Sequence, residues 1–284
     1  MSKVFLWVNS DLDGVGSTVV LGNIFPDIEY KSVFFGDFQK QYMEWRTDNL
    51  DNYEKVFIVG MVLDQSLVNK IDEPKVVFVS DRGKKVNLFE STCICEDTTS
   101  CTRLLYKKFK PKFEFTTELK KLILYIDDYN SYALEHKESE YLNGLYRSTR
   151  FNKFNYFVKR FWNGYDGLTD KEMTIAENFF DSTEKEYSGL DKFEGEFKKW
   201  RVLATFTKMS VNEIAKKLID NHDHDAIVIV NPDTQFVSFR KNPKSEADIV
   251  LMAENLCDGG GSEWASGGKL TQKFLEFTTK LIQI

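Results

Sequence analysis

The sequence predicts an α/β fold with two domains, in which a doubly wound, mainly parallel sheet precedes a smaller α/β domain, with a cleft between the two. Short apolar, β-branched runs alternate with segments of helical length over the first ninety residues, as in parallel sheets that are buried on both faces. A second alternation of this kind begins near residue 199. The chain has 284 residues, 42 % of them hydrophobic, which is enough for two cores.

Four short runs in the first part of the chain predict buried parallel strands. These runs are Val4–Val8, Ser32–Phe35, Val56–Val59 and Val76–Val79. The intervening segments of helical pattern are 17–25, 39–47 and 66–71. Right-handed β-α-β units are therefore the simplest topology.

Polar residues and glycine follow three of these runs. Asp11 and Asp13 come after the first run, Gly60 after the third and Asp81 after the fourth. Ligands of parallel sheets bind beyond the carboxyl ends of the strands, so we expect these positions to face one cleft.

Residues 99–161 are helical in character, with an apolar stripe over 119–126 that ends at the acidic pair Asp127-Asp128. A carboxylate of this pair can reach back to the cleft, and the sequence does not say which of the two does so.

A change in composition predicts the domain boundaries. The interval 162–198 is rich in Gly, Asp, Glu, Lys and Ser, so we expect a first domain over 1–161, a connector over 162–198 and a second domain over 199–284. The second domain has predicted strands at 202–206, 226–230 and 235–240 and predicted helices at 211–219, 246–256 and from 272.

Composition limits the classes of function and the location of the protein. The net charge of −6 disfavours binding to long duplex nucleic acid, so any nucleotide recognition must be local. The first apolar run is too short for a signal peptide or a membrane span, and we expect a cytoplasmic protein. Cys93, Cys95, Cys101 and Cys257 lack the spacing of a zinc site, and we expect free thiols.

Asp11-Leu12-Asp13-Gly14 is the first candidate site. Two carboxylates one residue apart in a turn can converge on one hard divalent cation. The alternative is an ordinary strand-to-helix turn, in which an aspartate caps the helix and the glycine bends the chain.

The second candidate is the charged turn Asp81-Arg82-Gly83-Lys84. Arg82 can bind a phosphate through its guanidinium fork, and a solvated turn is the alternative.

The third candidate lies near the C-terminus, where Arg240 ends a predicted strand and Gly259-Gly260-Gly261-Ser262 follows a predicted helix. Bare backbone N–H groups of glycines suit phosphate oxygens, and the guanidinium adds fixed charge. The alternative is a flexible loop.

In this order, the three motifs and the helical acid resemble those of the DHH phosphoesterase superfamily. The resemblance covers nearly the whole chain, from residues 8–17 through 79–84 and Asp127-Asp128 to 238–240 and 259–267. It implies a parallel-sheet domain that binds two manganese ions, a smaller domain that grips the substrate, and metal-assisted hydrolysis of a phosphate ester.

Several positions depart from the family pattern. Asn9 stands where the family has His, Gly60 where it has a bridging Asp, and Arg82 and Gly83 where it has two histidines. Ser262 replaces a further His. A tight two-metal site is hard to build from the residues that remain.

The first functional hypothesis is a metal-dependent phosphoesterase that acts on a nucleotide or a short oligonucleotide, with Asp13 and Asp81 as catalytic residues. Its predicted metal ligands, for Mn²⁺ or Mg²⁺, are Asp11, Asp13, Asp81 and Asp128. Its predicted substrate-binding residues are Arg82, Arg240, Gly259, Gly260, Gly261 and Ser262.

The second hypothesis is a catalytically inactive protein that binds and retains a nucleotide, because a guanidinium at Arg82 puts fixed charge where a metal ligand normally lies. A structural protein whose two sites have decayed is the third. The sequence does not identify the ligand, and it leaves the oligomeric state open, a homodimer included.

Overall fold

The structure is a computed structural model that describes residues 3–61, 63, 65–81, 91–96, 98–131, 133–208, 211–261 and 263–284. It divides into two compact units, 1–179 and 180–284. No helix in these described ranges is long and apolar enough to cross a membrane. The α/β class predicted from the sequence is confirmed, with a parallel sheet in the first unit and a mixed sheet in the second.

The first unit is built on a five-stranded sheet in the order β2-β1-β3-β4-β5, with every pair parallel. The strands are β1 (Val4–Asn9), β2 (Glu29–Val33), β3 (Lys55–Val59), β4 (Val76–Ser80) and β5 (Thr92–Cys95). The chain moves outward from β1 to β2 and then returns to the other side of β1 for β3. The switch point between β1 and β3 is the usual place for a ligand in such a sheet.

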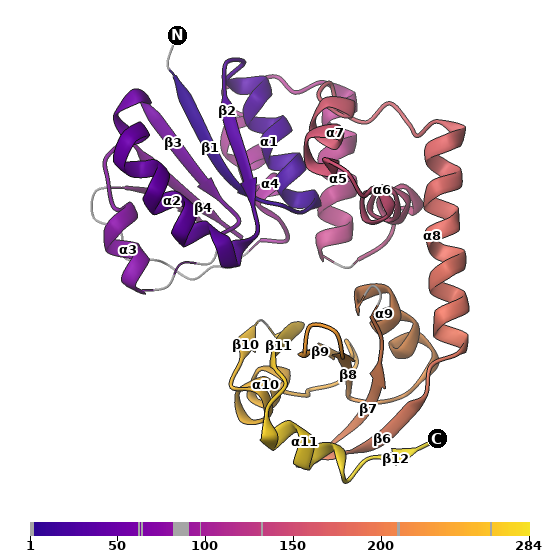
Figure 1. The fold of residues 1–284 in the computed structure, drawn as a ribbon. Coiled ribbons are helices and arrows are strands. Elements are labelled where there is room, and N and C mark those ends of the chain that lie inside the picture. The colour runs from indigo at the N-terminus through magenta and orange to yellow at the C-terminus, as the bar shows by residue number, and fades with distance from the viewer. Residues whose placement is uncertain are drawn as a thin grey trace. The chain divides into compact units, whose positions relative to one another are not determined.

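Helices cover both faces of this sheet (Figure 1). The helices on one face are α2 (Phe35–Asn49) and α3 (Gln65–Ile71), and those gathered beyond the other face are α1 (Leu12–Ile24), α4 (Cys101–Phe109), α5 (Thr117–Ser131), α6 (Lys137–Ser148) and α7 (Lys153–Arg160). Under α2, the fully buried Trp7 lies edge-on to Phe38 and Tyr42, at ring-centroid distances of 5.7 and 6.0 Å. Each such aromatic pair stabilises the fold by roughly 0.5–1.5 kcal/mol, in addition to the effect of burying its apolar area.

Helix α1 is buried along most of its length because small residues let its neighbours approach. A Cβ at Gly16 would lie 2.5 Å from Thr102 Oγ1 of α4, and a Cβ at Gly22 would lie 2.1 Å from the ring of Trp162. The glycines thus bring α4 and the segment after α7 against α1.

The second unit has a seven-stranded mixed sheet in the order β10-β11-β9-β8-β7-β6-β12. Its strands are β6 (Lys192–Phe197), β7 (Trp200–Phe206), β8 (Ala226–Asn231), β9 (Phe236–Lys241), β10 (Gly260–Gly261), β11 (Ala265–Lys269) and β12 (Ile282–Gln283). The helices α10 (Ile249–Cys257) and α11 (Gln272–Thr278) cover one face, and α9 (Val211–Asn221) packs on the other.

Helix α8 (Asp170–Ser188) occupies much of the interval predicted as the connector, and the division between the two units falls within it. The predicted domain boundaries stay a prediction.

The structure corrects two details of the sequence analysis in the first unit. The second strand was predicted at Ser32–Phe35, but the observed strand β2 spans Glu29–Val33 and Phe35 already begins α2. The predicted strand was therefore placed too late in the chain. The exposed Glu29 and Lys31 alternate with partly buried residues at this sheet edge, so the strand lacks the continuous apolar pattern that identifies its neighbours.

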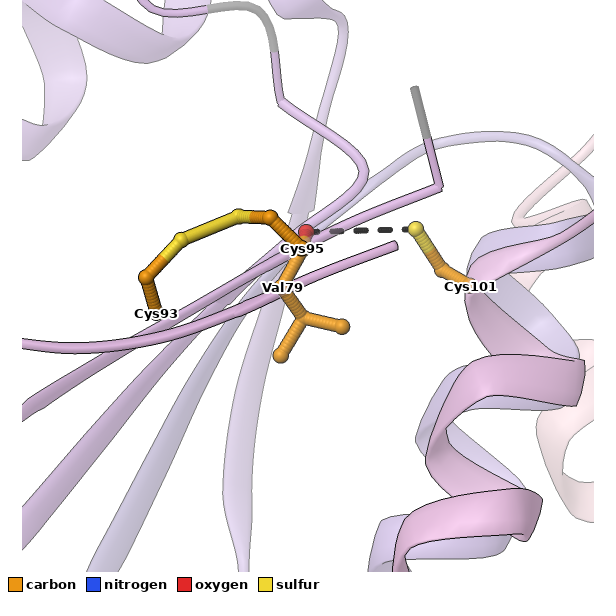
Figure 2. Close-up of a disulfide and its surroundings, with 4 residues drawn as sticks. All are labelled: Val79, Cys93, Cys95 and Cys101. Atoms are coloured by element: carbon orange, nitrogen blue, oxygen red, sulfur yellow. Dashed lines mark hydrogen bonds between the residues drawn. A yellow bond between two sulfur atoms is a disulfide. The ribbon is translucent and has the colours of Figure 1, made fainter. Parts of the chain in front are cut away.

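The prediction of free thiols is wrong for two of the four cysteines, because Cys93 and Cys95 form a disulfide on β5 (Figure 2). Residues two apart in a strand point to the same face, and their Cα atoms are 5.7 Å apart, within disulfide range. Cys101 and Cys257 are free and buried, as expected.

We predict that Gly22→Ala destabilises the first unit by about 1–3 kcal/mol, because the added methyl group overlaps the ring of Trp162. Gly36→Ala in α2 is the matched control, since a Cβ there meets nothing within 4 Å. The control should be neutral or stabilising by up to about 1 kcal/mol. Thermal unfolding of both variants measures the difference, and equal melting temperatures would contradict the packing described for α1.

Candidate functional site

A polar pocket lies at the carboxyl edge of β1, β3 and β4, at the switch point of the sheet. It is lined by Asn9, Asp11, Asp13, Gly14, Ser17, Val59, Gly60, Asp81 and Asn130. The positions that the sequence placed at this edge, Asp11, Asp13, Gly60 and Asp81, therefore do line one pocket. Its volume of about 100 Å³ suits ions and a phosphate group. A whole small-molecule ligand usually fills roughly 300–1,000 Å³, so most of a nucleotide would lie outside it.

Asp11 caps the helix that leads away from the pocket. Its backbone is extended, and its Oδ1 accepts a hydrogen bond of 2.7 Å from the N–H of Gly14, while Asn9 Nδ2 donates to Oδ2. A Cβ at residue 14 would lie 1.9 Å from the carbonyl oxygen of Asn9, so only glycine fits the tight exit from β1. The strand-to-helix turn considered as the alternative is thus present, and its capping carboxylate still lines the pocket.

Asp13 is held by the N-terminus of a second helix, α4. The N–H groups of Cys101 and Thr102 each donate to one oxygen of its carboxylate at 2.9 Å, and Thr102 Oγ1 donates to its carbonyl at 2.8 Å. Ser100 caps α4 through the N–H of Arg103. A helix N-terminus favours a negative charge, so α4 orients this carboxylate and stabilises its ionised form.

Burial and neighbouring charge oppose that stabilisation. Burial first, then the charges of Asp11 and Asp81, raise the pKa of Asp13 from 3.8 to about 7, although hydrogen bonds from Thr102 lower it. The negative charges of Asp11 and Asp81 therefore disfavour ionisation of the Asp13 carboxyl group. A cation bound beside Asp13 would offset this repulsion.

The donor set fits one divalent cation. Ligand atoms of Asp13, Asp81 and Cys101 all lie within 4.8 Å of one another, and Asp11 lines the same pocket. Carboxylate oxygens are the ligands that Mg²⁺ and Mn²⁺ prefer.

A second cation lacks comparable ligands among the described residues of the pocket. Gly60 has φ +69°, a backbone conformation that favours glycine, so no side chain enters the pocket from this position. Asn9 contributes an amide in place of a charged or imidazole ligand. The described residues of the pocket therefore offer ligands for one cation rather than two.

The structure does not bring Asp128 to the pocket. Its buried carboxylate accepts hydrogen bonds from the N–H groups of Glu135 and His136, at 2.9 and 3.2 Å, and from Ser139 Oγ at 2.5 Å. Burial raises the pKa of Asp128, but these hydrogen bonds outweigh it and hold the pKa below its usual value. Asp128 thus organises the connection between α5 and α6, and the expected metal ligand is not found at this position.

Asp127 does not line the pocket either, but it holds the segment that precedes α4. Thr99 Oγ1 donates to it, and Ser100 Oγ donates at 2.7 Å. One turn further along α5, Asn130 Nδ2 donates to the carbonyl of Thr99 at 2.6 Å and lines the pocket. Asn130 and the N–H groups that hold Asp13 were not predicted. The Thr99-Ser100 pair before a helical pattern is a helix-start signal that could have located the start of α4.

In the second unit, Arg240 lies on β9. Its Nε and Nη2 donate to Asn212 Oδ1 at 3.2 and 2.8 Å, and its Nη1 donates to the carbonyl of Phe239 at 2.9 Å. Both acceptors are uncharged groups that orient the guanidinium. The role of Arg240 toward a phosphate stays a prediction.

Two of the three successive glycines are required by the fold itself. A Cβ at Gly259 would lie 2.1 Å from the carbonyl oxygen of Gly267, and Gly261 has φ +154° with 2.4 Å to the carbonyl oxygen of Ala265. Gly260 and Gly261 pair with β11 as the short strand β10, so these two residues are not the flexible loop considered as the alternative. Only at Gly260, of these three, would a Cβ meet nothing within 4 Å. The two other predicted phosphate-binding residues, Arg82 and Ser262, lie outside the described residues.

Comparison with known proteins shows the fold of the chain. No family model matches it, and no curated protein matches it. Among solved structures, the pGpG-specific phosphodiesterase PggH from Vibrio cholerae is similar with a TM-score of 0.60 and 13 % identity, covering 98 % of this chain and 97 % of that chain. An exopolyphosphatase-related protein from Bacteroides fragilis has a TM-score of 0.58 at 12 % identity, covering 98 % and 91 %.

RecJ from Thermus thermophilus, in complex with Mn²⁺, has a TM-score of 0.58 at 11 % identity, covering 98 % of this chain and 51 % of that chain. At these identities the likeness concerns the fold alone. The chain has the fold of the DHH-type proteins.

We predict that Asp81→Asn lowers the pKa of Asp13 from its value of about 7, because one of the charges that raise it is removed. A carbon-13 NMR titration of the side-chain carboxyls in metal-free protein measures the shift. Asp37→Asn, a change of the same kind on the exposed surface of α2, should leave the pKa of Asp13 where it is. An unchanged pKa in Asp81→Asn would contradict the electrostatic account.

The same carboxylate predicts how stability changes with pH. A pKa raised in the folded state contributes stability that is fully present below 3.8 and is lost as the pH rises through about 7. We therefore compare the melting temperatures of Asp81→Asn and of the unsubstituted protein, both without metal. The value for Asp81→Asn minus the value for the unsubstituted protein should increase from pH 5 to pH 8. A difference that is constant over this range would count against the repulsion between these carboxylates.

Proposed function

We propose that this protein is a DHH-type phosphoesterase that binds a nucleotide or a short oligonucleotide and hydrolyses its phosphodiester with one divalent cation, Mn²⁺ or Mg²⁺. The observation that carries the proposal is the convergence of Asp11, Asp13 and Asp81 in one pocket at the switch point of the sheet. Proteins of the same fold support it: PggH is a pGpG-specific phosphodiesterase, and RecJ was solved in complex with Mn²⁺.

In this proposal Asp11, Asp13 and Asp81 would hold the cation, and a cation bound there would polarise a phosphoryl oxygen and neutralise developing charge. The chain itself positions the ligands. The N–H groups of Cys101 and Thr102 fix both oxygens of Asp13, and the turn at Gly14 fixes Asp11. Because the pocket is small, the scissile phosphate enters it while the base and sugar remain outside.

We also propose that Arg240 in the second unit binds a phosphate group of a nucleotide. Its guanidinium is already oriented by Asn212 and the carbonyl of Phe239, so little conformational entropy is lost when an anion binds. Gly260 is the one glycine of the three at which a Cβ would meet nothing within 4 Å. In this proposal its backbone N–H group donates to the same anion.

A second candidate function is retention of the nucleotide without hydrolysis. Gly60 and Asn9 favour it, because neither supplies the charge that a second cation needs to hold attacking and leaving oxygens together. The two candidates share the ligand and the first cation, and they differ only in turnover.

The decisive assay incubates the purified protein with Mn²⁺ and a panel of linear dinucleotides, cyclic dinucleotides and short oligonucleotides. We expect cleavage that a chelator abolishes and that Asp13→Ala lowers by more than about 100-fold. Removing a residue that hydrogen-bonds a metal ligand already lowers metal affinity or activity by roughly 10–100-fold. Removing the ligand itself should lower them further. Asp27→Ala, an exposed acid beyond α1, is the matched control and should retain activity. Binding without cleavage would select the retention function, and absence of both would overturn the two candidates together.

A further prediction concerns the contribution of the second unit. Arg240→Ala should weaken nucleotide binding by about 10–100-fold, the effect of one charge-assisted hydrogen-bonding group, and should leave Mn²⁺ affinity unchanged. Calorimetry with nucleotide and with Mn²⁺ separates the two effects. The control is Arg201→Ala, which removes an exposed arginine paired with Asp223. Equal nucleotide affinities in the two variants would remove Arg240 from the proposed site.

A further inference from the structure

Cys101 is a buried thiol beside the acidic pocket. It begins α4 and is 1 % exposed, and its Sγ lies 3.9 Å from the carbonyl oxygen of Val79 at the end of β4 (Figure 2). Its Sγ and the ligand oxygens of Asp13 and Asp81 lie within 4.8 Å of one another. Three donors from α1, the end of β4 and the start of α4 thus surround one point.

Most buried free cysteines act as small apolar side chains in a core. Cys257 is of this kind, because it packs in the apolar cluster beneath α10. Cys101 differs, because its neighbours include two carboxylates and the space beside Gly60, where a Cβ would lie 3.9 Å from its Sγ. Its backbone is fixed by the hydrogen bond from its N–H to Asp13. The thiol is therefore held at the position from which a cation would be reached.

We infer that Cys101 is a thiolate ligand and that it forms a cation site with Asp13 and Asp81. This site prefers Zn²⁺, or another cation as soft as Zn²⁺, over Mg²⁺. This inference deepens the proposed function and rests on the cation site described there. Thiolates select Zn²⁺ and carboxylates accept it, whereas Mg²⁺ requires oxygen ligands.

The donor atoms are near enough to converge on one ion after a local adjustment. A sulfur and an oxygen donor on a tetrahedral Zn²⁺ lie about 3.6 Å apart. The ligand atoms here lie within 4.8 Å of one another, so metal binding would draw the side chains together by about 1 Å. On binding, the S–H bond of Cys101 breaks, a sulfur–metal bond forms and one proton passes to the solvent.

The test uses Co²⁺ as a spectroscopic probe of the metal-free full-length chain. A thiolate bound to Co²⁺ gives a charge-transfer band in the near ultraviolet, which oxygen ligands do not give. We expect one equivalent of this band in the unsubstituted chain and in Cys257→Ala. The band should also remain when Cys93 and Cys95 are both replaced by serine, and it should be absent in Cys101→Ser. Circular dichroism verifies that each variant is folded.

Calorimetry with Zn²⁺ and Mn²⁺ gives an independent readout. Cys101→Ser should weaken Zn²⁺ binding by at least about 100-fold and Mn²⁺ binding by less, while Asp81→Asn should weaken both. Co²⁺ binding without the band, or an equal band in Cys101→Ser, would overturn the inference and leave the cation site of the proposed function intact. If neither Co²⁺, Zn²⁺ nor Mn²⁺ binds, the inference and the proposed function fail together.

Discussion

The pair of hydrogen bonds that joins α4 to Asp13 is the constraint on which the pocket depends. The N–H groups of Cys101 and Thr102 lie 88 and 89 residues away in sequence, and each donates to one oxygen of the same carboxylate. Gly16 permits this contact, because a Cβ there would overlap Thr102. The packing of two helices thus decides where this carboxylate lies, and the like charges of Asp11 and Asp81 beside it raise its pKa.

The sheet supplies the rest of the arrangement. β1, β3 and β4 end at the same edge, so residues distant in sequence emerge together at the switch point. The turn at Gly14 sends the chain from β1 directly into α1, which keeps Asp11 and Asp13 beside each other. Gly60 ends β3 without a side chain at the same edge. Among the described residues, the ends of β1 and β4 supply the carboxylates of the pocket and the end of β3 supplies none.

Much of this could be predicted from the sequence, and the limits have physical causes. β1, β3 and β4 are buried on both faces and show continuous apolar runs, whereas the edge strand β2 alternates and was placed too late. The shared edge of parallel strands placed Asp11, Asp13 and Asp81 together. The direction of the Asp128 side chain depends on a loop seven to eleven residues later in the chain, which no local pattern reveals. Arg82 and Ser262 stay predictions.

The central claim is that three aspartates at the switch point hold one divalent cation. Crystals grown in the presence of Mn²⁺ and measured at the manganese absorption edge test it most directly. The account predicts a single anomalous peak in the first unit, in contact with oxygen atoms of Asp11, Asp13 and Asp81. A map without a peak among these carboxylates, or with two cations bridged there, would contradict it.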